Sequence, residues 1–272
     1  MKPNTLKYLS IASISLALFS PTINADTSWM KKVKPFKNGT HAKLKPTKLE
    51  YGLSWNGALK AGEIKFEFNK KDKRYKGLDI SQAYGRSQNI AYGLFPYQFS
   101  MTSFTNEKTQ KPIIFVADEK DKREKVKTTN TFKSHGVIHS STKDKFSEKK
   151  IQKRDHTFKF ANTHDPISAI QYIRRQALKT GDKINLSLHP FKSPMFAEIS
   201  VLGKEKHNGR NCIKLDVKLQ KIDLTTMHLK LYKKLTKATL WISDDADRVL
   251  VELRSKVFIG DVRMVLKKQS PL

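Results

Sequence analysis

Residues 49–68, which read LEYGLSWNGALKAGEIKFEF, decide the fold class of this chain. Apolar side chains alternate with polar or small ones at Leu53 and Trp55, and the same period of two returns in the second half of the stretch. The dipeptide Asn56-Gly57 between the two runs is a common hairpin turn, although the whole connection is longer than two residues. The pattern therefore predicts an opening pair of antiparallel strands.

The same alternation recurs along the rest of the chain. Further strands are predicted over residues 75–84, 97–103, 112–117, 124–132, 133–140, 183–188, 196–202, 212–219, 228–232, 238–242, 248–254 and 262–266. Roughly a dozen short strands at a spacing of about 8–12 residues indicate a mainly β protein, an antiparallel sandwich or barrel.

One helix is well signalled among these strands, over residues 165–178. Asp165 supplies an N-cap and Pro166 suits the first helical position. The apolar positions that follow fall on one face, and Gly181 ends the helix, so we expect it to pack on the sheet. A weaker helix signal covers residues 87–95.

The first 25 residues have the features of a secretory signal peptide. Lys2 and Lys7 flank the start of an apolar run at residues 8–19, and we expect cleavage near Ala25. The run is too short to span a bilayer as a stable helix, and no second long apolar stretch follows. These features predict a periplasmic or secreted bacterial protein whose mature chain has no transmembrane segment.

Three further ranges complete the expected organisation. Residues 26–47 are rich in lysine and are interpreted as a basic, flexible lead, and residues 48–268 as a single β-rich domain. Within that domain, the Lys-rich residues 143–155 are predicted to form a solvated loop. The single cysteine, Cys212, excludes an internal disulfide and is interpreted as a packing residue.

The charge of the chain predicts a polyanionic partner. The 272 residues include 53 Lys and Arg against 25 Asp and Glu, a formal net charge of +28. A nucleic-acid reader would add aromatic stacking platforms or a recognition helix to this charge, and neither is evident. We therefore expect an anionic lipid, lipopolysaccharide or an acidic polysaccharide rather than nucleic acid, with general surface solvation as the alternative explanation of the charge.

The spacing of the histidines indicates no metal site. His135 and His139 have the spacing of two ligands on a helix, but Gly136 and the β-branched residues after it favour a strand, which would hold them more than about 10 Å apart. His156 and His164 lack a carboxylate at ligand spacing and are interpreted as solvated or hydrogen-bonding residues. The sequence thus predicts no metal and no cofactor.

The acidic residues indicate no calcium site, and the sequence motifs indicate no enzymatic reaction. The cluster Asp244, Asp245 and Asp247 lacks the glycine and the distal glutamate of a calcium loop, so a β-turn is the better interpretation. The common hydrolase, zinc-protease and phosphate-loop motifs do not occur.

Three runs carry a family resemblance: DPISAIQYIR at residues 165–174, LKTGD at 178–182 and LWISDD at 240–245. In this order they resemble the bacterial exported family called domain of unknown function 3108, over about residues 49–266. The resemblance implies a curved antiparallel sheet or half-open barrel with one packed helix, similar in shape to lipoprotein carriers. It implies no reaction.

We expect from these features a non-enzymatic envelope protein that binds an amphiphilic or anionic envelope component. Four residues are candidate ligand contacts: Arg174, Trp241, Tyr172 and Trp55. For Arg174 the alternative is a structural role, since a cation near a helix C-terminus can donate to loop carbonyls. Trp241 alternates with core-facing neighbours and should point to the opposite side of its strand, into a ligand cleft or under a covering loop.

Two other functions stay open. A structural or scaffold protein of the envelope would have a filled barrel interior, whereas a ligand carrier needs open apolar volume. A glycan-active enzyme would require paired carboxylates from distant strands, for which the candidates are Glu63, Glu67, Glu198 and Glu252.

Overall fold

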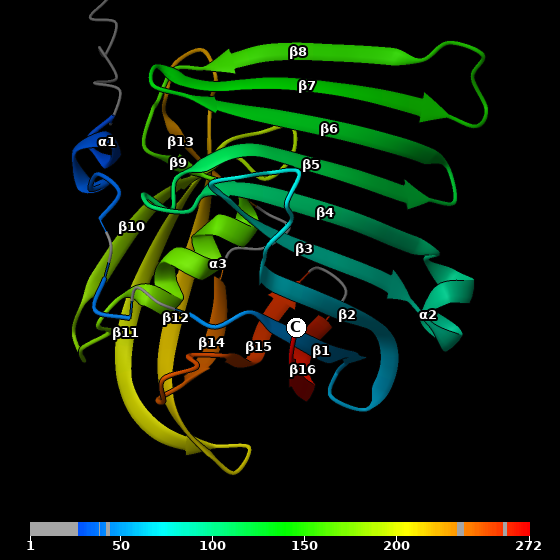
Figure 1. Cartoon of the computed structure of the whole chain (residues 1–272). Helices are drawn as coiled ribbons and strands as arrows, with labels where there is room; N and C mark the ends of the chain where they lie inside the picture. Colours follow the sequence, from blue (N-terminus) through cyan, green and yellow to red (C-terminus); the bar gives the residue numbers. More distant parts are fainter. Residues whose placement is uncertain (1–26, 38, 42–43, 233–236, 258–259) are drawn as a thin grey trace, which may run out of the picture.

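The computed structural model describes residues 27–37, 39–41, 44–232, 237–257 and 260–272 (Figure 1). The predicted signal peptide lies outside the described residues. Within them, no helix has both the length and the apolar character needed to cross a membrane.

The described residues form one large, curved, mainly antiparallel sheet with three helices. Its first eight strands are β1 (Thr47–Trp55), β2 (Leu59–Lys70), β3 (Leu78–Ser87), β4 (Tyr97–Asn106), β5 (Pro112–Asp121), β6 (Glu124–Lys133), β7 (Gly136–Lys145) and β8 (Gln152–Phe158). The next eight are β9 (Thr163–His164), β10 (Lys183–Leu188), β11 (Met195–His207), β12 (Arg210–Ile222), β13 (Leu229–Leu231), β14 (Lys237–Ser243), β15 (Leu250–Val257) and β16 (Gly260–Pro271). The helices are α1 (Trp29–Lys32), α2 (Asn89–Leu94) and α3 (Pro166–Arg175).

The order of the strands makes two arms, the first formed by β1 to β8 and the second by β9 to β16, which meet at the pair β1–β16. It runs β8-β7-β6-β5-β4-β3-β2-β1-β16-β15-β14-β12-β11-β10-β9, with β13 beside β12. The pair β9–β10 is parallel and the other pairs are antiparallel. Figure 1 shows the two arms curving around α3, which contacts β3, β4, β9 and β10. The predicted fold, a curved antiparallel sheet or half-open barrel with one packed helix, is confirmed.

The predicted opening hairpin is present as β1 and β2. Tyr51 pairs with Ile64, and Leu49 pairs with Phe66 across the two strands. The turn between them needs a left-handed backbone, because Asn56 has a φ of 50° and Gly57 a φ of 75°. The rings of Tyr51, Phe66 and Phe68 enter the main core, as the alternation predicts.

Helix α3 begins as predicted and ends earlier. Asp165 caps it by accepting hydrogen bonds from the backbone N–H groups of Ile167 and Ser168, and Ser168 Oγ accepts one from the Asp165 N–H at 3.0 Å. The helix ends at Arg175 rather than at residue 178, because the chain becomes extended at Gln176 and Leu178 takes a φ of 55° with its side chain buried. The short helix α2 lies inside the range that carried the weaker signal.

The described part of the predicted flexible lead is packed. Trp29 is buried and donates from Nε1 to the carbonyl of Met227 at 2.8 Å, while Val33 and Leu44 are also buried. Trp29 and Val33 share one face because a short helix brings residues four apart together. Little apolar periodicity is needed for such a contact, which is why the sequence did not predict it.

The predicted loop at residues 143–155 is instead most of a hairpin. Strand β7 continues to Lys145 and β8 starts at Gln152, so that only residues 146–151 connect them. Residues 152–155 are exposed, and β8 is the last strand of its arm. A charged edge strand with both faces in water has no apolar alternation, and this composition suggested a loop.

Candidate functional site

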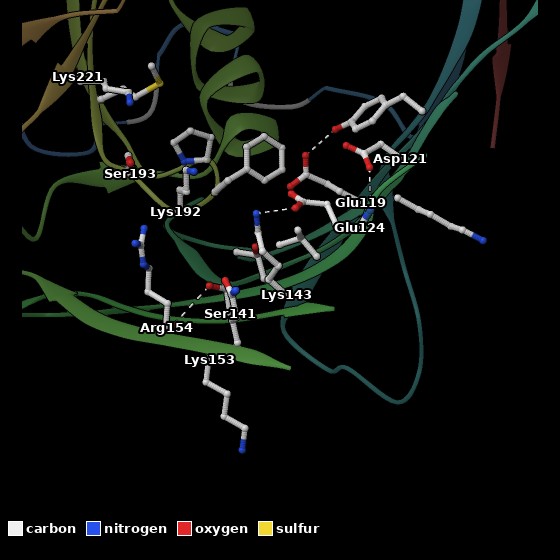
Figure 2. Close-up of a pocket in the computed structure, with 18 of the residues that line it drawn as sticks. Glu119, Asp121, Glu124, Ser141, Lys143, Lys153, Arg154, Lys192, Ser193 and Lys221 are labelled. Carbon is white, nitrogen blue, oxygen red and sulfur yellow. Dashed lines mark hydrogen bonds and ion pairs between the residues drawn. The ribbon is translucent and has the colours of Figure 1, made fainter. Parts of the chain in front are cut away.

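An open groove of about 700 Å³ is the candidate site (Figure 2). One wall consists of side chains from β4, β5, β6, β7 and β8, and the other of residues 190–193 with Met195, Lys221 and Tyr232. The groove exists because the hairpin β7–β8 extends the first arm past the segment that follows β10. The site was not predicted from the sequence, because strand β8 was not expected.

Positive charge exceeds negative charge along the groove. Six cationic side chains line it: Lys120, Lys143, Lys153, Arg154, Lys192 and Lys221. Three carboxylates also line it: Glu119, Asp121 and Glu124. Lys143 Nζ forms an ion pair with Glu124 Oε2 at 2.7 Å. Within the described part of the chain, Lys153, Arg154 and Lys192 make no ion pair, so their charge is available to a ligand.

The charges are separated along the groove. Figure 2 shows the three carboxylates on one side, and Arg154, Lys192 and Lys221 on the other. On the acidic side, Tyr97 donates its hydroxyl hydrogen to Glu119 Oε1 at 2.5 Å. Burial raises the pKa of Glu119 above its ordinary value, although the hydrogen bond from Tyr97 acts in the opposite direction. An anionic ligand group would therefore be favoured on the basic side.

Apolar surface accompanies the cations. Phe191, Pro190, Met195 and Tyr232 line the groove together with Lys192. Phe191 also packs on the core ring of Phe115 at a centroid distance of 6.4 Å, so this part of the wall is held in place by the core. The groove thus presents both a charged and an apolar surface to one ligand.

Three histidines lie next to the groove. His139 on β7 pairs with His156 on β8, and His189 follows β10. The ring centroids of His139 and His156 are 4.4 Å apart, and His156 Nε2 lies 3.2 Å from His189 Nε2. His139 Nε2 is 3.0 Å from the hydroxyl of Ser141, which lines the groove. The sequence did not connect these histidines, because their contacts come from hairpin register and from a distant segment.

Arg174, a predicted ligand contact, is buried in the core with 1% of its surface exposed. Its Nε donates to the carbonyl of Arg248 at 2.9 Å, and its Nη2 to the carbonyl of Asp247 at 3.0 Å. Its Nη1 donates to Gln171 Oε1 at 2.7 Å. These are the loop-carbonyl contacts of the structural alternative.

Trp241 pairs with Lys214 across β14 and β12 and is a buried member of the main core. Side chains cover the ring. His207 stacks on it at a centroid distance of 4.1 Å and an interplanar angle of 9°, and the charged ends of Lys214 and Arg254 lie 5.5 and 5.0 Å from its centre. Its Nε1 donates to Glu205 Oε1 at 2.6 Å. Neighbouring side chains therefore take the place of the predicted ligand cleft or covering loop.

The other two predicted ligand contacts, Tyr172 and Trp55, also lie outside the groove. Tyr172 on α3 is half-buried beside His164, with ring centroids 4.9 Å apart, and Trp55 is half-buried at the end of β1. None of the four predicted residues lines the groove. Their ligand role stays a prediction.

The carboxylates considered for a glycan-active enzyme each have a cationic neighbour or a histidine partner. Glu63 pairs with Arg86 at 2.9 Å, Glu67 with Lys70 at 3.7 Å and Glu198 with Lys218 at 3.9 Å. Glu252 is buried and accepts from His207 at 2.7 Å. Among the residues that the structure describes, no hydrogen bond joins two of these four glutamates.

Comparison with known proteins gives a family and a fold. The family described as Protein of unknown function (DUF3108) matches residues 50–267. No curated protein matches. Among solved structures, a beta-barrel-like protein of domain of unknown function DUF1849 from Brucella abortus covers 85% of this chain and 99% of its own, with 11% identity and a TM-score of 0.55. The lipoprotein LppX of Mycobacterium tuberculosis covers 84% and 88%, with 11% identity and a TM-score of 0.24, too low to compare folds.

Proposed function

This chain belongs to the DUF3108 family, and from that premise we propose that it is an exported protein of the bacterial envelope that binds an anionic amphiphile in the groove. The ligand is a lipid with a negatively charged headgroup. Binding involves no chemical reaction.

One observation carries the proposal: a single groove of about 700 Å³ brings cations and apolar side chains together. The headgroup would meet Arg154 and Lys192, while part of the acyl chain would cover Phe191 and Tyr232. Burial of apolar surface contributes about 25 cal/mol per Å², and charge-assisted hydrogen bonds fix the headgroup. An amphiphile uses both surfaces, whereas a purely polar anion or a hydrocarbon uses one.

The size and charge of the groove support a lipid rather than a polymer. Its volume falls within the roughly 300–1,000 Å³ of small-ligand sites. The formal net charge of +28 favours approach to an anionic membrane surface over several ångströms, before any contact forms. The net charge therefore attracts the protein to anionic membranes, and the groove determines which lipid binds.

A packed interior favours a second function, that of an envelope scaffold. The space between α3 and the sheet holds buried side chains such as Ile167 and Ile173 on the helix and Ile199 on β11. A filled interior is what the scaffold hypothesis expects. The groove lies outside this core, so binding of a lipid there separates the two hypotheses.

The experiment measures binding of two soluble short-chain lipids by calorimetry, dihexanoyl phosphatidylglycerol and dihexanoyl phosphatidylcholine. We expect the anionic lipid to bind more tightly. The double variant Arg154→Gln/Lys192→Gln should weaken its binding at least tenfold, and Tyr232→Ser should weaken binding of both lipids.

The matched control is Lys267→Gln/Lys268→Gln, which removes the same charge from exposed positions on β16. It should change the affinity less than twofold. Equal losses in both double variants would show that binding depends on net charge rather than on the groove. Absence of binding to either lipid would favour the scaffold function.

A further inference from the structure

We propose that His139, His156 and His189 form a binding site for one divalent transition-metal ion of the Zn²⁺ or Cu²⁺ class, beside the groove. The proposal is independent of lipid binding. It replaces the expectation from the sequence, which was that the chain holds no metal.

The positions of the three ring nitrogens support the site. One nitrogen from each histidine lies within 4.8 Å of the others. The Nε2 atoms of His156 and His189 are 3.2 Å apart, and two nitrogens bound to a tetrahedral Zn²⁺ are about 3.3 Å apart. One pair thus already has ligand spacing. The third nitrogen lies no more than 4.8 Å from these two.

Asn130 orients one of the ligands. Its Nδ2 donates to the carbonyl of His189 at 2.8 Å, which fixes the amide so that Oδ1 faces His139 Nδ1 at 2.7 Å. His139 Nδ1 must then carry the hydrogen, which leaves Nε2 as an acceptor, 3.0 Å from the Ser141 hydroxyl. Ligating histidines in metal sites are commonly held by a second partner in this way. Asn130 therefore links two of the three proposed ligands.

His139 and His189 are buried and His156 is half-buried, so an ion bound between them would be largely shielded from water. A neutral imidazole offers one lone pair to a metal ion.

In the absence of a metal ion, the close contact between His156 and His189 constrains the tautomers of both rings. Without an ion, one of these Nε2 atoms must carry hydrogen and donate it to the other. A metal ion would bind both Nε2 lone pairs and fix the tautomers of both rings. Each Nδ1 would then carry hydrogen.

Three nitrogen ligands determine the class of ion. Imidazoles suit Zn²⁺, Cu²⁺ and Ni²⁺, while Mg²⁺ and Ca²⁺ require oxygen ligands. Three protein ligands leave one position of a tetrahedron open, as in zinc sites that bind a water molecule or substrate. Ser141 lies beside His139 and lines the groove, so water or an anionic group from the groove can take that position.

The test titrates Zn²⁺ into the chelator-treated, tag-free mature protein by calorimetry, and follows Co²⁺ binding by visible absorption. We expect one equivalent of Zn²⁺ to bind and Co²⁺ to give the intense bands of a tetrahedral site. His156→Gln, at the most exposed of the three positions, should weaken Zn²⁺ binding at least 100-fold, and Asn130→Ala about tenfold.

His135→Gln is the matched control, because His135 is exposed in the turn between β6 and β7. It should leave Zn²⁺ affinity within twofold of the parent. Far-UV circular dichroism identifies variants that fail to fold, and His139→Gln then replaces His156→Gln. Undiminished Zn²⁺ binding in folded His156→Gln and His139→Gln, or no binding in the parent protein, would overturn the proposal.

Discussion

The guanidinium of Arg174 lies 4.8 Å from the centre of the Phe68 ring, in the core between α3 and β2. A buried cation over an aromatic face gains electrostatic attraction that water does not screen. Burial lowers the pKa of Arg174 to about 10, so the side chain stays charged at neutral pH. Because it also bonds two carbonyls of the turn before β15, Arg174 joins the helix, the first arm and the second arm.

Arg174→Ala should lower the free energy of unfolding by roughly 3 kcal/mol or more, since it leaves two buried carbonyls and Gln171 without their donor. Urea unfolding followed by circular dichroism measures this change. The control Arg74→Ala removes an exposed arginine that pairs with Asp72 and should leave the midpoint unchanged. Similar midpoints for the two variants would contradict the structural role of Arg174.

Trp241→Ala should cost about 3–5 kcal/mol of stability, because the side chain is buried and is packed between charged side chains. Trp241→Phe keeps the stacking on His207 and should cost much less. The measurement is the same urea titration, with lipid affinity determined in parallel. A stable Trp241→Ala variant with lost lipid affinity would instead support the ligand role predicted from the sequence.

Glu252 should make stability fall in acid. Its burial favours the neutral form, but hydrogen bonds from Arg254, His207 and Asn208 outweigh this and hold the pKa below its ordinary value of 4.5. The unfolded chain therefore takes up a proton first as the pH falls. The stabilisation is complete above pH 4.5 and is lost between that value and the lower pKa of the folded state.

Glu252→Gln removes this dependence. It should lower stability at pH 7, and the difference from the parent protein should shrink as the pH falls below 4.5, in urea titrations at a series of pH values. Glu63→Gln, at an exposed ion pair with Arg86, is the control and should follow the parent curve. A constant difference at all pH values would show that the network does not stabilise the charged form.

The N-cap of α3 should contribute about 2 kcal/mol to the free energy of unfolding. Asp165→Ala removes the acceptor of two helix N–H groups and of the Ser103 hydroxyl, which donates to Asp165 Oδ2 at 2.7 Å. Chemical denaturation measures the loss. Asp182 also accepts a hydrogen bond from a backbone N–H, that of Lys179, in the exposed turn after the helix. We expect Asp182→Ala to cost several times less stability than Asp165→Ala.

Charge on β8 should keep the protein from associating through its edge. Lys153→Val/Asp155→Val converts one face of this exposed strand into an apolar one, and we expect concentration-dependent oligomers by light scattering. Lys125→Val/Lys127→Val adds the same residues to β6, whose backbone is paired on both sides, and should stay monodisperse. Equal association of both variants would assign the effect to hydrophobicity alone.

Sequence patterns predicted the strands, turns and caps that depend on residues close together in the chain. The bounds of β10 match the expected residues 183–188, and the Asn56-Gly57 turn and the Asp165 cap lie where their residue types predict. In each case the signal comes from residues within one element or its immediate neighbours. Alternation and capping are therefore sufficient for the fold class.

The candidate site depends on relations that no local pattern contains. His139 meets His156 only through the register of a hairpin, and His189 joins them from another arm. Arg174 was predicted as a ligand contact, with hydrogen bonds to loop carbonyls as the alternative, and the carbonyls that it reaches lie far along the chain, at residues 247 and 248. The roles of these histidines and of Arg174 follow from neighbours in the folded structure that are distant in the sequence.

The central pairing of β1 with β16 affects how the chain reaches its folded state. Thr47 faces Pro271 across this seam, whereas β2 to β8 each pair with the strand that precedes them in sequence. Closing a loop of this length costs more chain entropy than closing a hairpin, so we expect the arms to form quickly and the seam to form in the slowest step. A circular permutant that joins β16 to β1 and opens residues 146–151 would turn the seam into a local hairpin and should fold faster.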